Sequence, residues 1–151
     1  MANRLPVESF SFPVDKIKAG YYTDAYFIRS AEILNGDNYH PRVLMQVFAR
    51  DHVVVCGTDE VIALINTCAF HPETIVIHSL HDGEEVDEWE TVMTIEGDYA
   101  DFAHLETLYL GIVARQSRIA TNVRKVVKAA NGKPVLFFPA RYDIYQTQES
   151  D

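Results

Sequence analysis

The sequence predicts an α/β fold in which helices and strands pack together and lead into the first strand of an incomplete α/β barrel. Apolar residues at helical spacing alternate along the chain with short segments rich in β-branched residues. Asp82-Gly83 lies between two such segments and is typical of a hairpin, which makes part of the sheet antiparallel. The wholly apolar segment 134–138 follows a long helix, as a buried barrel strand does. A closed barrel of this kind has eight strands, so one strand is only its beginning.

Composition narrows the class of protein. The chain has 151 residues, 48% of them hydrophobic, which suits one soluble domain and the start of a second. Its net charge of −9 argues against a nucleic-acid partner, because nucleic-acid binders present a basic face. The basic residues that do cluster lie among apolar residues and are interpreted as a solvated helix face: Arg115, Arg118, Arg124, Lys125 and Lys128.

The two cysteines, Cys56 and Cys68, form no CxxC pair and have no metal-ligand set around them, so buried, reduced thiols and no metal site are expected. The N-terminus has no apolar signal core, and no segment approaches the roughly 20 apolar residues of a membrane span. These features predict a cytoplasmic protein without a membrane partner.

The first half of the chain predicts an extended arm over 9–14, a turn over 16–20, and then a helix. Thr23 or Asp24 caps this helix, and Asn35-Gly36 ends it. Its buried face is Phe27, Ala31 and Leu34. Segments 42–48 and 52–56 are predicted strands, although one bent strand, or a helix for the first, remains open. Thr58 caps a short helix whose buried stripe is Val61, Ile62, Leu64 and Ile65.

The second half predicts strands over 74–78 and 90–96, joined by a hairpin. The acidic run from Asp82 to Glu90 lacks the spacing of a calcium loop, and no lysine lies between 74 and 96 to carry a lipoyl or biotinyl group. A solvated hairpin tip is therefore expected. A long helix capped by Asp98 follows, with a break near Gln116-Ser117, and it ends at Asn131-Gly132. Residues 139–151 end without an anchor, so the chain is interpreted as cut or as completed by a partner.

Two clusters are candidate substrate-binding sites. At the start of the first long helix, Tyr26 can stack on a flat ligand while Asp24 takes a hydrogen bond; the alternative is that Asp24 caps the helix and Tyr26 belongs to the core. At the end of the last strand, Phe138 can stack and Arg141 can grip a phosphate or carboxylate. The alternative there is a core phenylalanine and a solvated arginine. No residue is assigned a catalytic role.

The order of these motifs resembles that of a known family. The motifs are Thr23-Asp24-x-Tyr26, Leu105-Glu106-Thr107, Ile119-Ala-Thr-Asn122 and Phe138-x-x-Arg141. Over roughly residues 20–151 the chain is similar to the N-terminal part of the nicotinate phosphoribosyltransferase family, which has the type II phosphoribosyltransferase fold, and more loosely to quinolinate phosphoribosyltransferase. The segment 138–141 departs from the family pattern, in which a glycine commonly follows the aromatic residue.

The resemblance implies an N-terminal α/β domain with a mainly antiparallel sheet over 1–115, and a helix and first barrel strand over 116–151. It implies a homodimer in which Tyr26 stacks on the pyridine ring from across the interface, opposite Phe138. Asp24 would lie beside the ring, and Arg141 would bind phosphoribosyl diphosphate or the carboxylate region.

The activity that the resemblance implies is the joining of nicotinate and phosphoribosyl diphosphate to give nicotinate mononucleotide in NAD salvage. Mg²⁺ and ATP are the implied cofactors, with most of their ligands beyond this chain, so the 151-residue chain is expected to be inactive alone. Quinolinate phosphoribosyltransferase is the close alternative; it requires several basic residues for two carboxylates, and the segment 22–27 points away from it. A non-catalytic dimerisation or ligand-binding module is the third possibility.

Overall fold

The computed structural model of the protein describes residues 4–138. The elements in chain order are η1 (Val7–Ser9), α1 (Val14–Lys18), α2 (Ala25–Gly36), β1 (Arg42–Phe48), β2 (Val53–Val54), α3 (Thr58–Cys68), η2 (Pro72–Thr74), β3 (Val76–Ser79), β4 (Glu85–Val86), β5 (Thr91–Asp98), α4 (Tyr99–Phe102), η3 (Ala103–Leu105) and α5 (Glu106–Ala130). This mixture of helices and strands confirms the predicted α/β class. Within residues 4–138, none of the helices combines the length and apolar character that a bilayer crossing requires.

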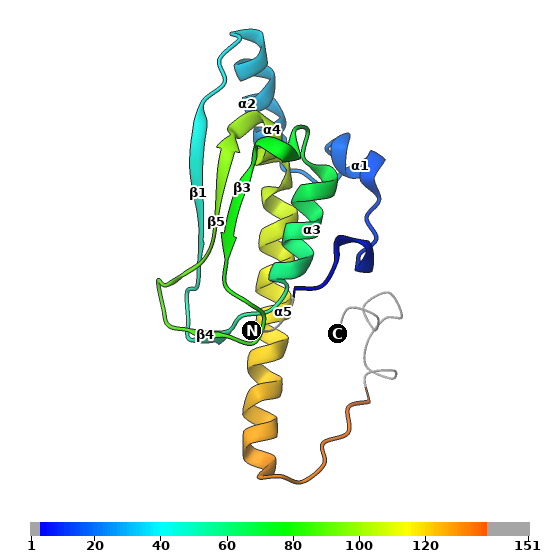
Figure 1. Cartoon of the computed structure of the whole chain (residues 1–151), viewed down its shortest axis with the longest axis vertical. Helices are drawn as coiled ribbons and strands as arrows, with labels where there is room; N and C mark the ends of the chain where they lie inside the picture. The colour runs from blue at the N-terminus through cyan, green and yellow to red at the C-terminus, as the bar shows by residue number, and fades with distance from the viewer. Residues whose placement is uncertain (1–3, 139–151) are drawn as a thin grey trace.

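The main sheet has three antiparallel strands in the order β1-β5-β3, and α3 and α5 lie against one of its faces (Figure 1). The centre strand β5 pairs with both neighbours, so that Ile95 lies opposite Met45 on one side and Ile77 on the other. The predicted mainly antiparallel sheet is thereby confirmed. The C-terminal half of α5 extends past the sheet.

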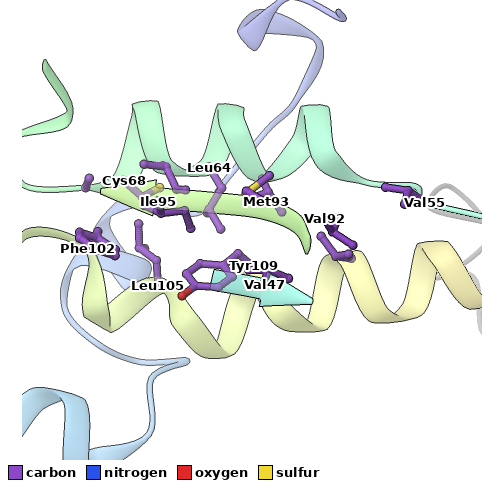
Figure 2. Packing of buried hydrophobic residues seen from close by; sticks show 14 of the residues in the cluster. Val47, Val55, Leu64, Cys68, Val92, Met93, Ile95, Phe102, Leu105 and Tyr109 are labelled. Carbon is purple, nitrogen blue, oxygen red and sulfur yellow. The ribbon is translucent and has the colours of Figure 1, made fainter. Parts of the chain in front are cut away.

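The core lies between the sheet and the two long helices (Figure 2). Met93 and Ile95 project from β5 toward Leu64 and Cys68 of α3, while Tyr109 projects from α5. All five side chains are no more than 1% exposed. Burial of this kind stabilises a fold by roughly 1.5–3 kcal/mol for each large apolar side chain. The sheet and both helices therefore form one cooperative unit that holds the ends of α2 and α5 in place.

The N-terminal segment is helical in part, whereas an extended arm over 9–14 and a turn over 16–20 were expected; residues 10–13 are in neither helix nor strand. Residues 7–9 form a 3₁₀ turn and α1 occupies 14–18, with Ile17 only 2% exposed. An anchor outside the segment fixes it, because the guanidinium of Arg4 donates to Oδ1 of Asp59 at 2.6 Å and to the carbonyl of Ser79 at 2.8 Å. Such long-range contacts leave no periodic signal in the sequence.

The predicted hairpin is present, but its connection is longer than a two-residue turn. Strands β3 and β5 pair antiparallel, and the residues between them include β4, which pairs with β2 in a separate ribbon. The predicted solvated tip is confirmed, since residues 82–90 are exposed except Val86, but Asp82 also makes contacts that the sequence did not predict. Its carboxylate accepts from the backbone N–H groups of Gly57 and Thr58 at 3.0 and 2.9 Å. Asp82, rather than Thr58, therefore satisfies the first N–H groups of α3.

Helix α5 is continuous through the predicted break at residues 116–117. The polar residues in that region face β2: Ser117 Oγ accepts from the N–H of Cys56 at 3.0 Å, and Thr121 Oγ1 accepts from the N–H of Val54 at 2.9 Å. Within residues 4–138, β2 pairs only with β4, and these two hydroxyls serve as hydrogen-bond partners for β2 and the residue that follows it. The helix also crosses the predicted boundary at 115–116 without interruption, and the division into two domains stays a prediction.

The predicted strand 134–138 does not form in the described structure. Helix α5 ends as expected at Asn131, which has a left-handed φ of 47°. Residues 133–138 then have no regular structure, and Leu136, Phe137 and Phe138 are 78%, 70% and 74% exposed. The physical reason is that a barrel strand exists only when neighbouring strands complete its backbone hydrogen bonds.

Candidate functional site

The candidate site lies where the start of α2 meets the start of α5. Thr107 Oγ1 donates to Oδ2 of Asp24 at 3.0 Å, and Thr23 Oγ1 donates to the carbonyl of His104 at 2.7 Å. The structure thus joins two motifs that lie more than 80 residues apart in the chain. The two hydrogen bonds hold the start of α2 against the segment that opens α5.

Asp24 occupies the N-cap position of α2, with an extended ψ of 136°, but its side chain accepts no backbone N–H. A carboxylate at this position ordinarily satisfies one of the free N–H groups of the first turn. Here it instead accepts the hydroxyl hydrogen of Thr107. The alternative in which Asp24 acts as a side-chain cap is therefore wrong.

Tyr26 is 57% exposed, so the alternative that places its ring in the core is wrong as well. The ring packs on Phe27 with centroids 4.2 Å apart, and Phe27 is itself only 3% exposed. Desolvation raises the pKa of the Tyr26 hydroxyl, and the nearby carboxylates of Asp24 and Glu106 raise it further. Tyr26 is therefore a neutral, supported aromatic surface open to a ligand.

Glu106 gives the site a second carboxylate. Desolvation raises its pKa, and the negative charge of Asp24 raises it further. The phenols of Tyr99 and Tyr109 also have raised pKa values, first from their own burial and then from Glu106. The site thus combines two acidic groups with neutral phenols. It favours hydrogen-bond donors and cations, and it repels an isolated anion.

The second predicted cluster does not join the first within one chain. Phe138 follows the end of α5 in the chain, whereas Asp24, which precedes α2, contacts the start of this 25-residue helix. A helix of that length spans about 37 Å at a rise of about 1.5 Å per residue. Arg141 lies outside the described residues. The expectation that Tyr26 and Phe138 stack on one ring therefore stays a prediction.

Sequence reasoning assigned no role to Thr107 or Glu106, although both belong to a motif that it quoted. The available signal was that motif itself, a carboxylate and a hydroxyl side by side at the start of a long helix. Among residues 4–138, no group of three or more His, Cys, Asp or Glu side chains could hold a metal ion. Asp24 and Glu106 are a pair and do not meet that requirement.

Comparison with known proteins identifies the family. Residues 24–117 match the sequence family described as "Quinolinate phosphoribosyl transferase, N-terminal domain". The crystal structure of nicotinate-nucleotide pyrophosphorylase from Pyrococcus furiosus is similar, with 32% identity and a TM-score of 0.78 over 91% of this chain and 36% of that one. The chain therefore spans about a third of that protein's length.

More distant structures share the fold. The nicotinate-nucleotide pyrophosphorylase from Francisella tularensis has 19% identity and a TM-score of 0.57, over 80% of this chain and 43% of that one. Human nicotinic acid phosphoribosyltransferase has 15% identity and a TM-score of 0.67, over 83% of this chain and 32% of that one. The type II phosphoribosyltransferase fold expected from the motifs is thus confirmed for the N-terminal domain.

These findings correct the expected activity. The nicotinate phosphoribosyltransferase assignment is wrong, because the matching family and the nicotinate-nucleotide pyrophosphorylase structures support the quinolinate alternative. The segment 22–27 seemed to point away from quinolinate phosphoribosyltransferase, yet that family's match begins inside it, at residue 24. The physical reason for the error is that Tyr26 offers a ring surface, and stacking does not distinguish one pyridine carboxylate from another. The chain belongs to the family of quinolinate phosphoribosyltransferase N-terminal domains.

Proposed function

We propose that this chain is the N-terminal domain of an enzyme that joins quinolinate to phosphoribosyl diphosphate and yields nicotinate mononucleotide for NAD biosynthesis. The observation that carries the proposal is the family match over residues 24–117. Since the chain spans about a third of the Pyrococcus furiosus protein, we propose that a barrel domain supplies the remainder of the active site.

The reaction is a pentosyl transfer followed by decarboxylation. The pyridine nitrogen forms a bond to the anomeric carbon of the ribose, and the bond from that carbon to diphosphate breaks. Diphosphate leaves with the electron pair. The carboxylate next to the ring nitrogen then leaves as CO₂, and a proton takes its place on the ring carbon. The cationic ring stabilises the electron pair left by CO₂, so one CO₂ accompanies each mononucleotide.

We assign Tyr26 the role of stacking on the pyridine ring, a role supported by its exposure and its packing on Phe27. Asp24 and Glu106 repel carboxylates, so neither binds quinolinate directly. Asp24 instead fixes the start of α2 through Thr107 and thereby orients the tyrosine. Quinolinate has two carboxylates, and each needs a cationic partner. We propose Arg141 as one of these cations.

We propose a homodimer in which Tyr26 of one copy and Phe138 of the other lie on opposite faces of the ring. The support is that the segment holding Tyr26 contacts the start of α5, whereas Phe138 follows the end of that helix in the chain. A cytoplasmic location is proposed on the basis of the two free cysteines, Cys56 and Cys68.

Magnesium is proposed only as a companion of the diphosphate, because the described residues do not fit a magnesium site and no step is derived through it. ATP coupling, and with it ligase chemistry, was expected from the nicotinate assignment. Release of CO₂ supplies a driving force of its own in the quinolinate reaction, so ATP has no proposed role.

The test is an assay with phosphoribosyl diphosphate, magnesium and either quinolinate or nicotinate. The mononucleotide product is quantified by mass spectrometry, and the CO₂ released is measured with carboxyl-labelled quinolinate. The chain is assayed alone and together with the polypeptide that supplies the barrel. We expect product from quinolinate with equimolar CO₂, and only when the barrel is present. Product from nicotinate alone, or none from the complete protein, would refute the proposal.

A further inference from the structure

A second concave surface lies between the β1–β2 connection and the middle of α5. It is a cleft of about 680 Å³, within the usual range of roughly 300–1,000 Å³ for small-molecule sites. Its deepest part is apolar and formed by Val47, Val92 and Val113, which are 7%, 4% and 8% exposed. Leu110 and Phe48 line it as well and are 41% and 39% exposed. The cleft therefore offers an apolar surface to a flat group.

Cationic side chains surround this apolar surface. Arg118 and Lys125 line the cleft from α5, and Arg50 lines it from the β1–β2 connection. Residues 118 and 125 are seven positions apart and so lie on one face of the helix, about 10.5 Å apart along its axis. Asp51 is the one carboxylate among the lining residues.

These cations contrast with two neighbouring residues whose side chains contact the acidic run 82–90. His52 pairs with Asp87 at 2.8 Å, and Arg124 pairs with Glu85 at 2.7 Å. In the part of the chain that the structure describes, no ion pair is formed by Arg50, Arg118 or Lys125. In a protein of net charge −9, three unpaired cations around one apolar cleft lower the cost of binding an anion there.

The cleft is separate from the site around Tyr26. From Glu106, at the start of α5, to Arg118 the helix rises roughly 18 Å, at about 1.5 Å per residue. No residue that lines the cleft belongs to the group formed by Asp24, Tyr26 and Thr107. Substitutions in the cleft therefore leave the proposed quinolinate contacts intact.

We propose that this cleft binds a nucleoside monophosphate, with the phosphate between Arg118, Lys125 and Arg50 and the base on the apolar surface. A phosphate monoester carries a charge of about −1.5 to −2 near neutral pH, which matches several cations better than one carboxylate does. A guanidinium binds two phosphate oxygens at once. An inorganic anion is too small to occupy the cleft, so the remaining volume is assigned to the ring.

The test uses the 151-residue chain labelled with ¹⁵N and titrated with adenosine 5′-monophosphate, adenosine or inorganic phosphate. We expect amide shifts over 47–53 and 110–125 with the monophosphate. Adenosine and phosphate should each bind at least about tenfold more weakly, because each supplies only one of the two contacts. Arg118→Gln and Lys125→Gln should each weaken the binding of the monophosphate about tenfold. Lys128→Gln is the matched control, since Lys128 lies one turn on and does not line the cleft.

The proposal would be overturned by an absence of shifts with the monophosphate, by equal affinity for inorganic phosphate, or by equal losses of affinity in Arg118→Gln and Lys128→Gln. Shifts confined to the segment around Tyr26 would place the nucleotide in the other site and would also refute it. Both cleft positions are exposed, so the variants should fold, and unchanged amide positions in β5 serve as the check. The outcome does not depend on the quinolinate assay.

Discussion

Thr107 donates its hydroxyl hydrogen to Oδ2 of Asp24 at 3.0 Å, so the first turn of α5 holds the residue that precedes α2. This one contact connects the core, through α5, to the exposed ring of Tyr26. Because Asp24 does not cap its own helix, its orientation depends on Thr107.

Replacing Thr107 with Val should remove this hydrogen bond while keeping the shape of the side chain. A typical hydrogen bond contributes about 0.5–1.5 kcal/mol, and this exposed one belongs at the low end of that range. We expect a loss of about 0.5 kcal/mol in the free energy of unfolding, measured by urea titration, and a larger loss in kcat/KM for quinolinate in the complete enzyme. Thr107→Ser keeps the hydroxyl and should restore both. Equal kcat/KM values for Thr107→Val and Thr107→Ser would show that Thr107 does not position Tyr26.

Asp82→Ala should destabilise the fold by about 2 kcal/mol, because the carboxylate accepts from two backbone N–H groups at the start of α3. It also accepts from Thr58 Oγ1 at 2.7 Å. Chemical denaturation followed by circular dichroism measures the change. Asp87→Ala is the matched control in the same acidic run, where the carboxylate is 80% exposed and pairs, among residues 4–138, only with His52. The control should lose no more than about 0.5 kcal/mol; comparable losses in both variants would contradict the assigned cap.

His104 predicts a dependence of stability on pH. Its side chain is 6% exposed, its Nδ1 has no hydrogen-bond partner, and burial lowers its pKa below the ordinary 6.5. The unfolded chain therefore takes up a proton below pH 6.5 that the folded chain does not bind until a lower pH. The stability that His104 contributes is therefore present above pH 6.5 and is lost as the pH falls below that value.

The measurement is the free energy of unfolding of the wild type and of His104→Gln at pH 7.5 and 5.5. The wild type should lose more stability on acidification than the variant does. His71 is the control, because its hydrogen bond to Asp101 raises its pKa and gives the opposite sign, with stability lost as pH rises through the folded value. His71→Gln should therefore make the acid loss larger. An acid loss unchanged in His104→Gln would show that this histidine does not cause it.

The sequence was informative where structure is local. Helix α2, helix α5 and the β3–β5 pairing follow from residue periodicity and from the turn residues between them. The same reasoning fails for the segment 134–138, whose apolar composition suits a strand but whose backbone has no neighbouring strand in this chain. Apolar composition predicts where a segment can be buried, and it does not supply the partner.

The contacts that shape the site are long-range and polar, and no periodic pattern encodes them. Asp24 has the position of a helix cap. Only the tertiary structure shows that its carboxylate accepts from Thr107 instead of from a backbone N–H of its own helix. The hydrogen bonds from the start of α3 to the exposed Asp82 were missed for the same reason. The identity of the substrate could not be predicted either, because Tyr26 offers only a ring surface and the carboxylates near it repel any pyridine carboxylate alike.

Thr121→Val should be among the most damaging conservative substitutions on α5. Thr121 Oγ1 accepts from the N–H of Val54 and donates to the carbonyl of Ser117, and the residue is 8% exposed. Val keeps the shape and leaves the N–H of Val54 buried without a partner, at a cost of about 1–3 kcal/mol. Amide hydrogen exchange measures this directly, since the Val54 amide should lose protection while amides in the centre of β5 keep theirs. Thr121→Ser should retain that protection. If the Val54 amide exchanges at the same rate in Thr121→Val and Thr121→Ser, the hydroxyl does not hold β2 against the helix, and packing alone positions that strand.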